Sequence, residues 1–258
     1  MRKGAQKMND KLQNIGHILD LAKRAYSRNI YTYSAFLSIL EQGTIKKELI
    51  KAGFTSWYFY GGNEAAIRKI IIFGDGNEIP YEPEIPVCAI KICPLSEKYA
   101  QSLSHRDYLG AIMNLGIDRS MTGDIIIKDN VAWLLCLRNT AEYISDNLNK
   151  VKNTDVKCSV YTDSVPEIEP VFEEMKLNVS SERLDCICAA ILSKSRGTAQ
   201  ALIKDERIFI NEACITDAGT RLKAGDSLVI RGTGKFIYEG IEAYTKKGRS
   251  YINVKKYT

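Results

Sequence analysis

The side chains best suited to chemistry in this sequence are His105, Arg106 and Asp107, because an imidazole close to a carboxylate is a common acid–base pair. The surrounding residues indicate a structural use instead. Ser104 and Asp107 have the spacing of a capping box, and the apolar helical pattern that follows them ends at Gly116. We therefore expect Asp107 to cap a helix and not to act as a general base.

His105 and Arg106 would lie in the first turn of that helix, where a positive charge faces the positive end of the helix dipole. A nearby anion would offset this unfavourable interaction. An RNA phosphate and an acidic side chain of the same protein fit equally well. Both residues are therefore candidates for RNA contact.

The motifs of common enzyme classes are missing from the sequence. A protein-kinase catalytic loop would need Asn where Ile112 stands, and Gly234-Lys235 is followed by Phe236 instead of the Ser or Thr of a P-loop. The sequence has only two histidines, His17 and His105, and seven cysteines without a Cys-x-x-Cys pair. We expect no catalytic residues, no metal and no cofactor.

A second group of candidate residues is basic. From Val179 to Thr258 the sequence contains 14 Lys and Arg against 9 Asp and Glu, whereas the preceding 178 residues contain 22 of each. The whole excess of +5 therefore lies in the C-terminal third, as is typical of a nucleic-acid-binding surface. Singly, such side chains are more often solvated surface charges. As a cluster, we expect them to contact RNA together with two polar neighbours: Arg183, Lys194, Ser195, Arg196, Gln200, Lys204 and Lys235.

The elements that would position this cluster are two short helices and a sheet. Apolar spacing predicts a helix over residues 184–192, and Ser195 would cap a second helix. Arg196 and Lys204 fall outside the apolar face of the second helix, so we expect both on the surface. Asp185, in the first turn of the first helix, is better explained by a structural ion pair or a cap than by chemistry. Alternating residues predict strands at 207–210, 227–231 and 236–244.

The chain as a whole predicts an α+β protein. Residues 1–54 have helical spacing, and residues 55–165 interleave strands and helices as in a small α/β sandwich, with a hairpin turn at Asp129-Asn130. Pro166 and Pro170 indicate a linker over 166–178, and the C-terminal domain would span 179–258. The longest apolar run, 131–137, is too short to cross a bilayer, and no apolar stretch follows the basic N-terminus. We expect a soluble cytoplasmic protein with reduced thiols.

With these residues in view, the sequence resembles the YlmH family of bacterial RNA-binding proteins. The most specific similarity is the string from Ser104 to Ile125, and the glycine pair within Phe59–Ala65 is also similar. The elements Arg-Leu-Asp at 183–185, Ser-Arg at 195–196 and Gly-Asp at 225–226 match the family's C-terminal domain. At 67–69 this sequence has Ile-Arg-Lys, where the family more often has a Glu-Arg start.

The resemblance implies an N-terminal helical region, a central RNA-recognition-like α/β sandwich and a small C-terminal RNA-binding domain of the ribosomal protein S-four type. It also implies a non-enzymatic protein that binds rRNA and tRNA on the large ribosomal subunit with stalled peptidyl-tRNA, in ribosome-associated quality control. The alternatives are an RNA-modifying enzyme of the pseudouridine synthase or rRNA methyltransferase type, and a cell-division interaction protein. We expect a monomer without a membrane partner.

Overall fold

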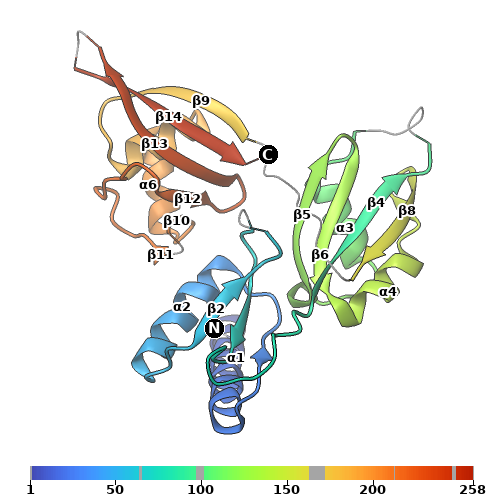
Figure 1. The fold of residues 1–258 in the computed structure, drawn as a ribbon. Coiled ribbons are helices and arrows are strands. Elements are labelled where there is room, and N and C mark those ends of the chain that lie inside the picture. The colour runs from blue at the N-terminus through green and yellow to red at the C-terminus, as the bar shows by residue number, and fades with distance from the viewer. Residues whose placement is uncertain are drawn as a thin grey trace. The chain divides into compact units, whose positions relative to one another are not determined.

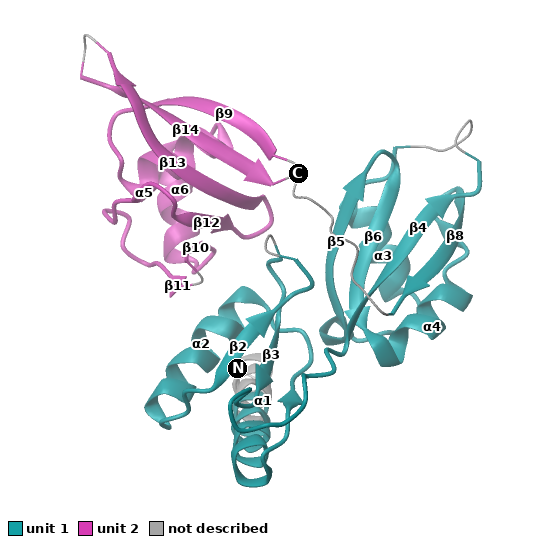
Figure 2. Cartoon of the chain, in the orientation of Figure 1, with its two compact units in different colours: residues 1–168 teal, residues 169–258 magenta. Residues whose placement is uncertain are grey.

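The computed structural model describes residues 2–63, 66–96, 102–162, 172–211, 213–245 and 248–257, with side chains from residue 14 onward. The chain divides into two compact units, residues 1–168 and 169–258, and each is described by itself (Figure 2). None of the helices in the described ranges is both long and apolar enough to cross a membrane.

The N-terminal part of unit 1 is a small sheet packed against two helices. Strands β1 (Thr32–Tyr33), β3 (Ile70–Phe73) and β2 (Trp57–Tyr60) pair antiparallel in that order. The apolar faces of α1 (Arg2–Arg28) and α2 (Ile39–Lys51) form one core with Ile71 and Phe73 of β3. The helical prediction for the first residues is thus confirmed for α1 and α2, with a short strand between them.

One sheet assignment from the sequence is wrong. The sequence analysis assigned the strands at 57–60 and 70–73 to the central sandwich, whereas they pair with residues 32–33 in the N-terminal sheet. The physical reason is that β3 is buried on both faces. Ile71 and Phe73 face the helices, and Ile70 and Ile72 enter a second core with Leu137. Four consecutive apolar residues give no sign of which sheet they join.

The second part of unit 1 is a five-stranded antiparallel sheet. Its order is β5 (Thr122–Lys128), β6 (Val131–Leu137), β4 (Val87–Pro94), β8 (Thr154–Tyr161) and β7 (Lys150–Val151). Helices α3 (His105–Met113) and α4 (Arg138–Asn147) pack on one face and form a single core with it (Figure 1). The predicted hairpin turn is confirmed, because Asp129 and Asn130 adopt φ of 51° and 60°.

Unit 2 packs two helices on one face of a six-stranded antiparallel sheet. The helices are α5 (Leu184–Leu192) and α6 (Arg196–Lys204), and both contribute to a core with the sheet. The sheet order is β11 (Ala213–Cys214), β10 (Ile208–Ile210), β12 (Ser227–Ile230), β13 (Gly234–Tyr244), β14 (Ser250–Tyr257) and β9 (Phe172–Val179). The predicted helix pair is confirmed.

The prediction of a linker over 166–178 is wrong for the residues of this range that the structure describes. Residues 172–178 belong to β9, which pairs with β14 from Phe172↔Tyr257 to Val179↔Ser250. Met175, Leu177 and Val179 alternate with polar residues and pack on the core of unit 2. The charged residues hid this period of two, because Glu174 and Lys176 occupy the face directed away from the core and Glu173 interrupts the apolar face. Residues 166–171 of the predicted linker lie outside the described residues.

Candidate nucleic-acid interface

The centre of the helix pair in unit 2 is Asp185, whose side chain is completely buried. Its Oδ2 atom accepts hydrogen bonds from Arg196 at 2.7 Å and from Gln200 at 2.9 Å. Arg183 approaches both carboxylate oxygens, at 3.3 and 3.4 Å. The expectation that Asp185 forms a structural ion pair is confirmed. The carboxylate joins the start of α5 to the exposed edge of α6.

The electrostatics of Asp185 reflect a balance of two effects. Burial alone would raise the pKa of this carboxyl, because it disfavours the charged form. Hydrogen bonds from Arg196, Arg183 and Gln200 outweigh burial and hold the pKa well below its ordinary value. In return, the carboxylate raises the pKa of Arg196. The group is therefore ionised, and two cations share one anion.

The predicted residues Arg183, Arg196 and Gln200 thus lie together, but their charges are not free. The side chains of Arg183 and Arg196 remain 43% and 53% exposed while they hold Asp185. An arginine carries five N–H donors, so the donors not directed at Asp185 can bind a further anion. The ion pair fixes the side-chain geometry before any ligand arrives.

The junction between the helices brings further predicted residues beside this cluster. Ser193 closes α5 in the left-handed conformation, with φ of 51°, and Ser195 caps α6 by accepting a hydrogen bond from the Thr198 amide at 3.1 Å. Lys194 lies between them and is exposed. Lys204 is exposed in the last turn of α6, where a cation is favoured by the helix dipole. Six of the seven predicted residues therefore belong to this helix pair.

Lys235 is placed differently. It pairs with Val229 in the sheet, and the residues that alternate with it, Phe236 and Tyr238, enter the core beneath the helices. Its side chain therefore lies on the sheet face opposite to α5 and α6, with its Nζ 4.9 Å from the centre of the Tyr257 ring. The structure does not bring Lys235 together with the helix-pair cluster.

In unit 1, Asp107 caps α3 as predicted. The Ser104 amide and hydroxyl donate to its Oδ2 at 2.9 and 2.8 Å, and Lys152 Nζ lies 2.8 Å from its Oδ1. The hydrogen bond from Lys152, followed by those from Ser104, lowers the pKa of Asp107 to about 2. The carboxylate is fully used by these contacts, which leaves no reason to assign it a chemical role.

His105 and Arg106 differ in their surroundings. The His105 residue is exposed, and partial desolvation of its imidazole lowers its pKa. The charge of Asp124 opposes this shift, so an acidic group of the protein itself acts on the imidazole. Arg106 is exposed, and among the residues that the structure describes it has no hydrogen-bond or ion-pair partner. It lines a shallow cavity of 590 Å³ with Asn114 and Lys152. Arg106 is therefore the better placed of the two to meet an external anion.

Sequence reasoning missed a polar junction between the two sheets of unit 1. Asp124 accepts hydrogen bonds from the amides of Ile67 and Arg68. The Arg68 guanidinium donates to the carbonyl groups of Phe36, Arg119 and Thr122 at 3.0 to 3.1 Å. The 67–69 segment, where the sequence departs from the family pattern, thus meets the 104–125 string in a structural lock. Their separation of more than fifty residues hid this contact from the sequence.

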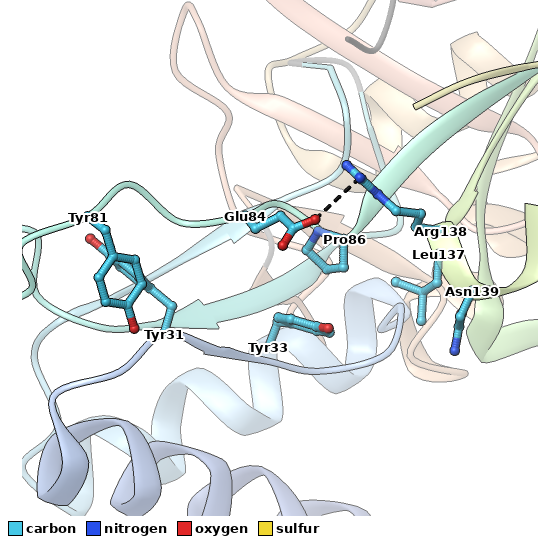
Figure 3. A pocket seen from close by; sticks show the side chains of 8 residues that line it. All are labelled: Tyr31, Tyr33, Tyr81, Glu84, Pro86, Leu137, Arg138 and Asn139. Atoms are coloured by element: carbon cyan, nitrogen blue, oxygen red, sulfur yellow. Dashed lines mark ion pairs between the residues drawn. The ribbon is translucent and has the colours of Figure 1, made fainter. Parts of the chain in front are cut away.

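A cavity of 480 Å³ in unit 1 is the other hollow with recognisable chemistry (Figure 3). Three tyrosines line it, Tyr31, Tyr33 and Tyr81, and Figure 3 shows the ion pair between Arg138 and Glu84 at 3.3 Å. Among the described residues that line this cavity there is no serine, cysteine or histidine, so these residues provide no nucleophile and base. The one cation among them, Arg138, is already paired with Glu84, which makes the cavity a poorer site for a phosphate than the helix pair.

Comparison with known families defines the class of protein. Residues 83–163 match the family "Putative RNA-binding domain in YlmH", and residues 182–228 match the family "S4 domain". The chain therefore combines two domains of RNA-binding families.

The comparison with a curated relative defines the particular family. The chain is 31% identical to the Ribosome-associated protein quality control protein P2 of Bacillus subtilis (strain 168) over 192 residues. This alignment covers 74% of each protein. The chain belongs to the YlmH family. It is also similar to a solved structure, the Cell division protein ylmH from Streptococcus pneumoniae. That match covers 60% of this chain and 91% of the other, at 15% identity and a TM-score of 0.47.

Proposed function

We propose that this protein is a non-enzymatic RNA-binding factor of the cytoplasm that acts as a monomer on the ribosome. Its target is the large subunit with stalled peptidyl-tRNA, where it contacts rRNA and tRNA during ribosome-associated quality control. Two observations support this proposal: the similarity to a Bacillus subtilis protein named for ribosome-associated quality control, and the matches to two RNA-binding domain families.

The single observation that carries the proposal is the arginine–aspartate cluster of the helix pair. Asp185 fixes Arg183 and Arg196, and about half of the surface of each arginine side chain stays exposed. Lys194 and Lys204 add exposed charges to the same helix pair. Guanidinium groups held in a fixed geometry lose little side-chain entropy when they bind a phosphate, so the cluster suits a folded RNA of defined shape.

Co-sedimentation tests the proposal directly. The full chain is mixed with 30S subunits, 50S subunits and 50S subunits that carry peptidyl-tRNA, and bound protein is measured after centrifugation. We expect the tightest binding to the peptidyl-tRNA complex and loss of binding when Lys194 and Lys204 are both replaced by Ala. Equal binding to all particles would contradict the proposal. Nucleoside analysis of RNA from a deletion strain separates this role from RNA modification, and a wild-type protein that co-sediments with none of the particles would favour a division-site role.

A further inference from the structure

The five-stranded sheet of unit 1 has one face that the helices do not cover. Side chains of β4, β6 and β8 that enter the core with α3 and α4 include Ile90, Leu134 and Val160. The residues that alternate with them point to the opposite face. That face, named here the outer face, carries Lys91, Trp133, Tyr161, Lys128 and Lys157.

Two aromatic rings meet at the centre of the outer face. The ring centres of Trp133 and Tyr161 lie 5.3 Å apart at an angle of 57°, and Lys91 Nζ lies 5.5 Å from the centre of the Trp133 ring. Trp133 is opposite Lys91 in the sheet, and Tyr161 is opposite Ala89. Because Ala89 has only a methyl group, the rings from the strands on either side of β4 can approach each other across it.

These rings remain accessible at the surface. Tyr161 is 38% exposed, Trp133 is partly exposed, and neither belongs to a hydrophobic core of unit 1. A partly exposed aromatic pair flanked by lysines is typical of a binding site, because tyrosine and tryptophan provide a large flat area for stacking.

The charges around the rings favour an anionic ligand. Lys91, Lys128 and Lys157 lie on three strands of the outer face, β4, β5 and β8. The two carboxylates of the same strands and face are already engaged. Asp155 lies 3.8 Å from Lys150, and Asp124 accepts from the backbone of the 67–68 turn. The outer face thus combines flat rings with an excess of positive charge.

We propose that the outer face is a stacking platform for unpaired RNA bases. Trp133 and Tyr161 stack on bases, and the three lysines neutralise the adjoining phosphates. Bases of a double helix are already stacked and cannot reach the rings, so the ligand is single-stranded RNA such as a loop or a free end. This site is independent of the helix pair in unit 2, which suits folded RNA.

Tryptophan fluorescence tests the proposal, because the chain has only two tryptophans, Trp57 and Trp133. Trp57 is anchored elsewhere, with its indole N–H donating to the Phe54 carbonyl at 3.1 Å. In the full chain, Trp57→Phe leaves Trp133 as the single reporter on the platform. Titration with a twelve-residue oligouridylate is expected to quench its emission. The reciprocal Trp133→Leu protein reports from Trp57 and is expected to show no quenching.

Affinity measurements provide the second arm. Trp133→Leu and Tyr161→Leu should each weaken binding of oligouridylate by at least about fivefold, the lower end of the effect of one base–aromatic stack. Tyr161→Phe keeps the ring and should bind as the wild type does. Binding of a stable RNA hairpin should stay unchanged in all three variants, which separates this site from the helix pair.

Two results would overturn the proposal: unquenched Trp133 emission at saturating oligouridylate, or wild-type affinity in Tyr161→Leu. If Trp133→Leu does not fold, the proposal is still tested by the titration of Trp57→Phe and by the affinities of the two Tyr161 variants. A face that binds protein instead of RNA would leave oligouridylate without effect on Trp133, and so would also count against it.

Discussion

Asp185 and Asp107 form an instructive pair, because each is a carboxylate in the first turn of a short helix close to an arginine. Asp107 caps its own helix and meets the exposed Lys152. Asp185 is buried and binds side chains from two helices. The same local pattern therefore gives a local cap in one domain and a tertiary ion pair in the other. The outcome depends on which side chains reach the carboxylate, since both aspartate side chains are at most 10% exposed.

The largest expected effect is on the stability of unit 2. Asp185→Asn removes the charge that Arg183 and Arg196 share, and breaking a buried ion pair from one side costs about 3 kcal/mol. Urea denaturation should show this loss in the free energy of unfolding. The matched control is Asp205→Asn, which changes an exposed carboxylate at the end of α6 and should stay within about 0.5 kcal/mol. Equal stability of the two variants would refute the structural role of Asp185.

The comparison also predicts how stability depends on pH. The pKa of Asp185 is lowered in the folded protein, and that of Asp107 is lowered to about 2. A group with a lowered pKa stabilises the fold above its unfolded pKa of about 3.9, and this contribution is lost as the pH falls through the folded pKa. Urea midpoints should therefore fall steeply below about pH 4. The difference between the wild type and Asp185→Asn should shrink in the same range, and a constant difference down to pH 2 would be inconsistent with this.

Replacement of Arg196 and of Lys204 should have different effects on stability, although both are exposed residues of α6. From the sequence, both are predicted to be surface residues. The loss of a surface residue usually leaves the melting temperature nearly unchanged. The structure corrects this for Arg196, since Arg196→Ala removes the shortest hydrogen bond to the buried carboxylate. We expect a clear drop in the melting temperature for Arg196→Ala and almost none for Lys204→Ala, with weaker RNA binding in both. Equal melting temperatures would show that Arg183 and Gln200 hold Asp185 alone.

The smallest effects concern α3. Arg106→Ala should weaken ribosome binding without a change in thermal unfolding, because the Arg106 side chain has no partner among the described residues. Asp107→Ala should lower the melting temperature through loss of the cap and the Lys152 contact, while binding stays intact. Both measurements are made on the same preparations. An Asp107→Ala protein that is stable but inactive would return a chemical role to the carboxylate.

Local features could be predicted from the sequence with good accuracy. The capping box of Ser104 and Asp107, the hairpin turn at Asp129-Asn130 and the cap at Ser195 each depend on residues no more than three positions apart. Such contacts are local, so the spacing of the residues can predict them without knowledge of the fold.

The contacts that could not be predicted join distant segments. Gln200 reaches Asp185 across fifteen residues, and Arg68 reaches Asp124 across fifty-six. Strand β9 was missed because its partner, β14, is about seventy residues away in the sequence, although the two strands are neighbours in the sheet. In each case the outcome depends on which surfaces pack together. The hydrophobic periodicity of a segment identifies its buried face but not the segment that packs against it.

The central claim is that unit 2 binds RNA through charge held by the helix pair, and the salt dependence of binding tests it most directly. The fragment must begin near residue 169, because β9 completes the sheet. If about four to five phosphates are neutralised, log affinity for a structured RNA should fall with log salt at a slope of roughly −3 to −4. Replacing Lys194 and Lys204 by Ala should reduce that slope by about 2. A salt response that is flat, or unchanged in the double variant, would contradict the claim.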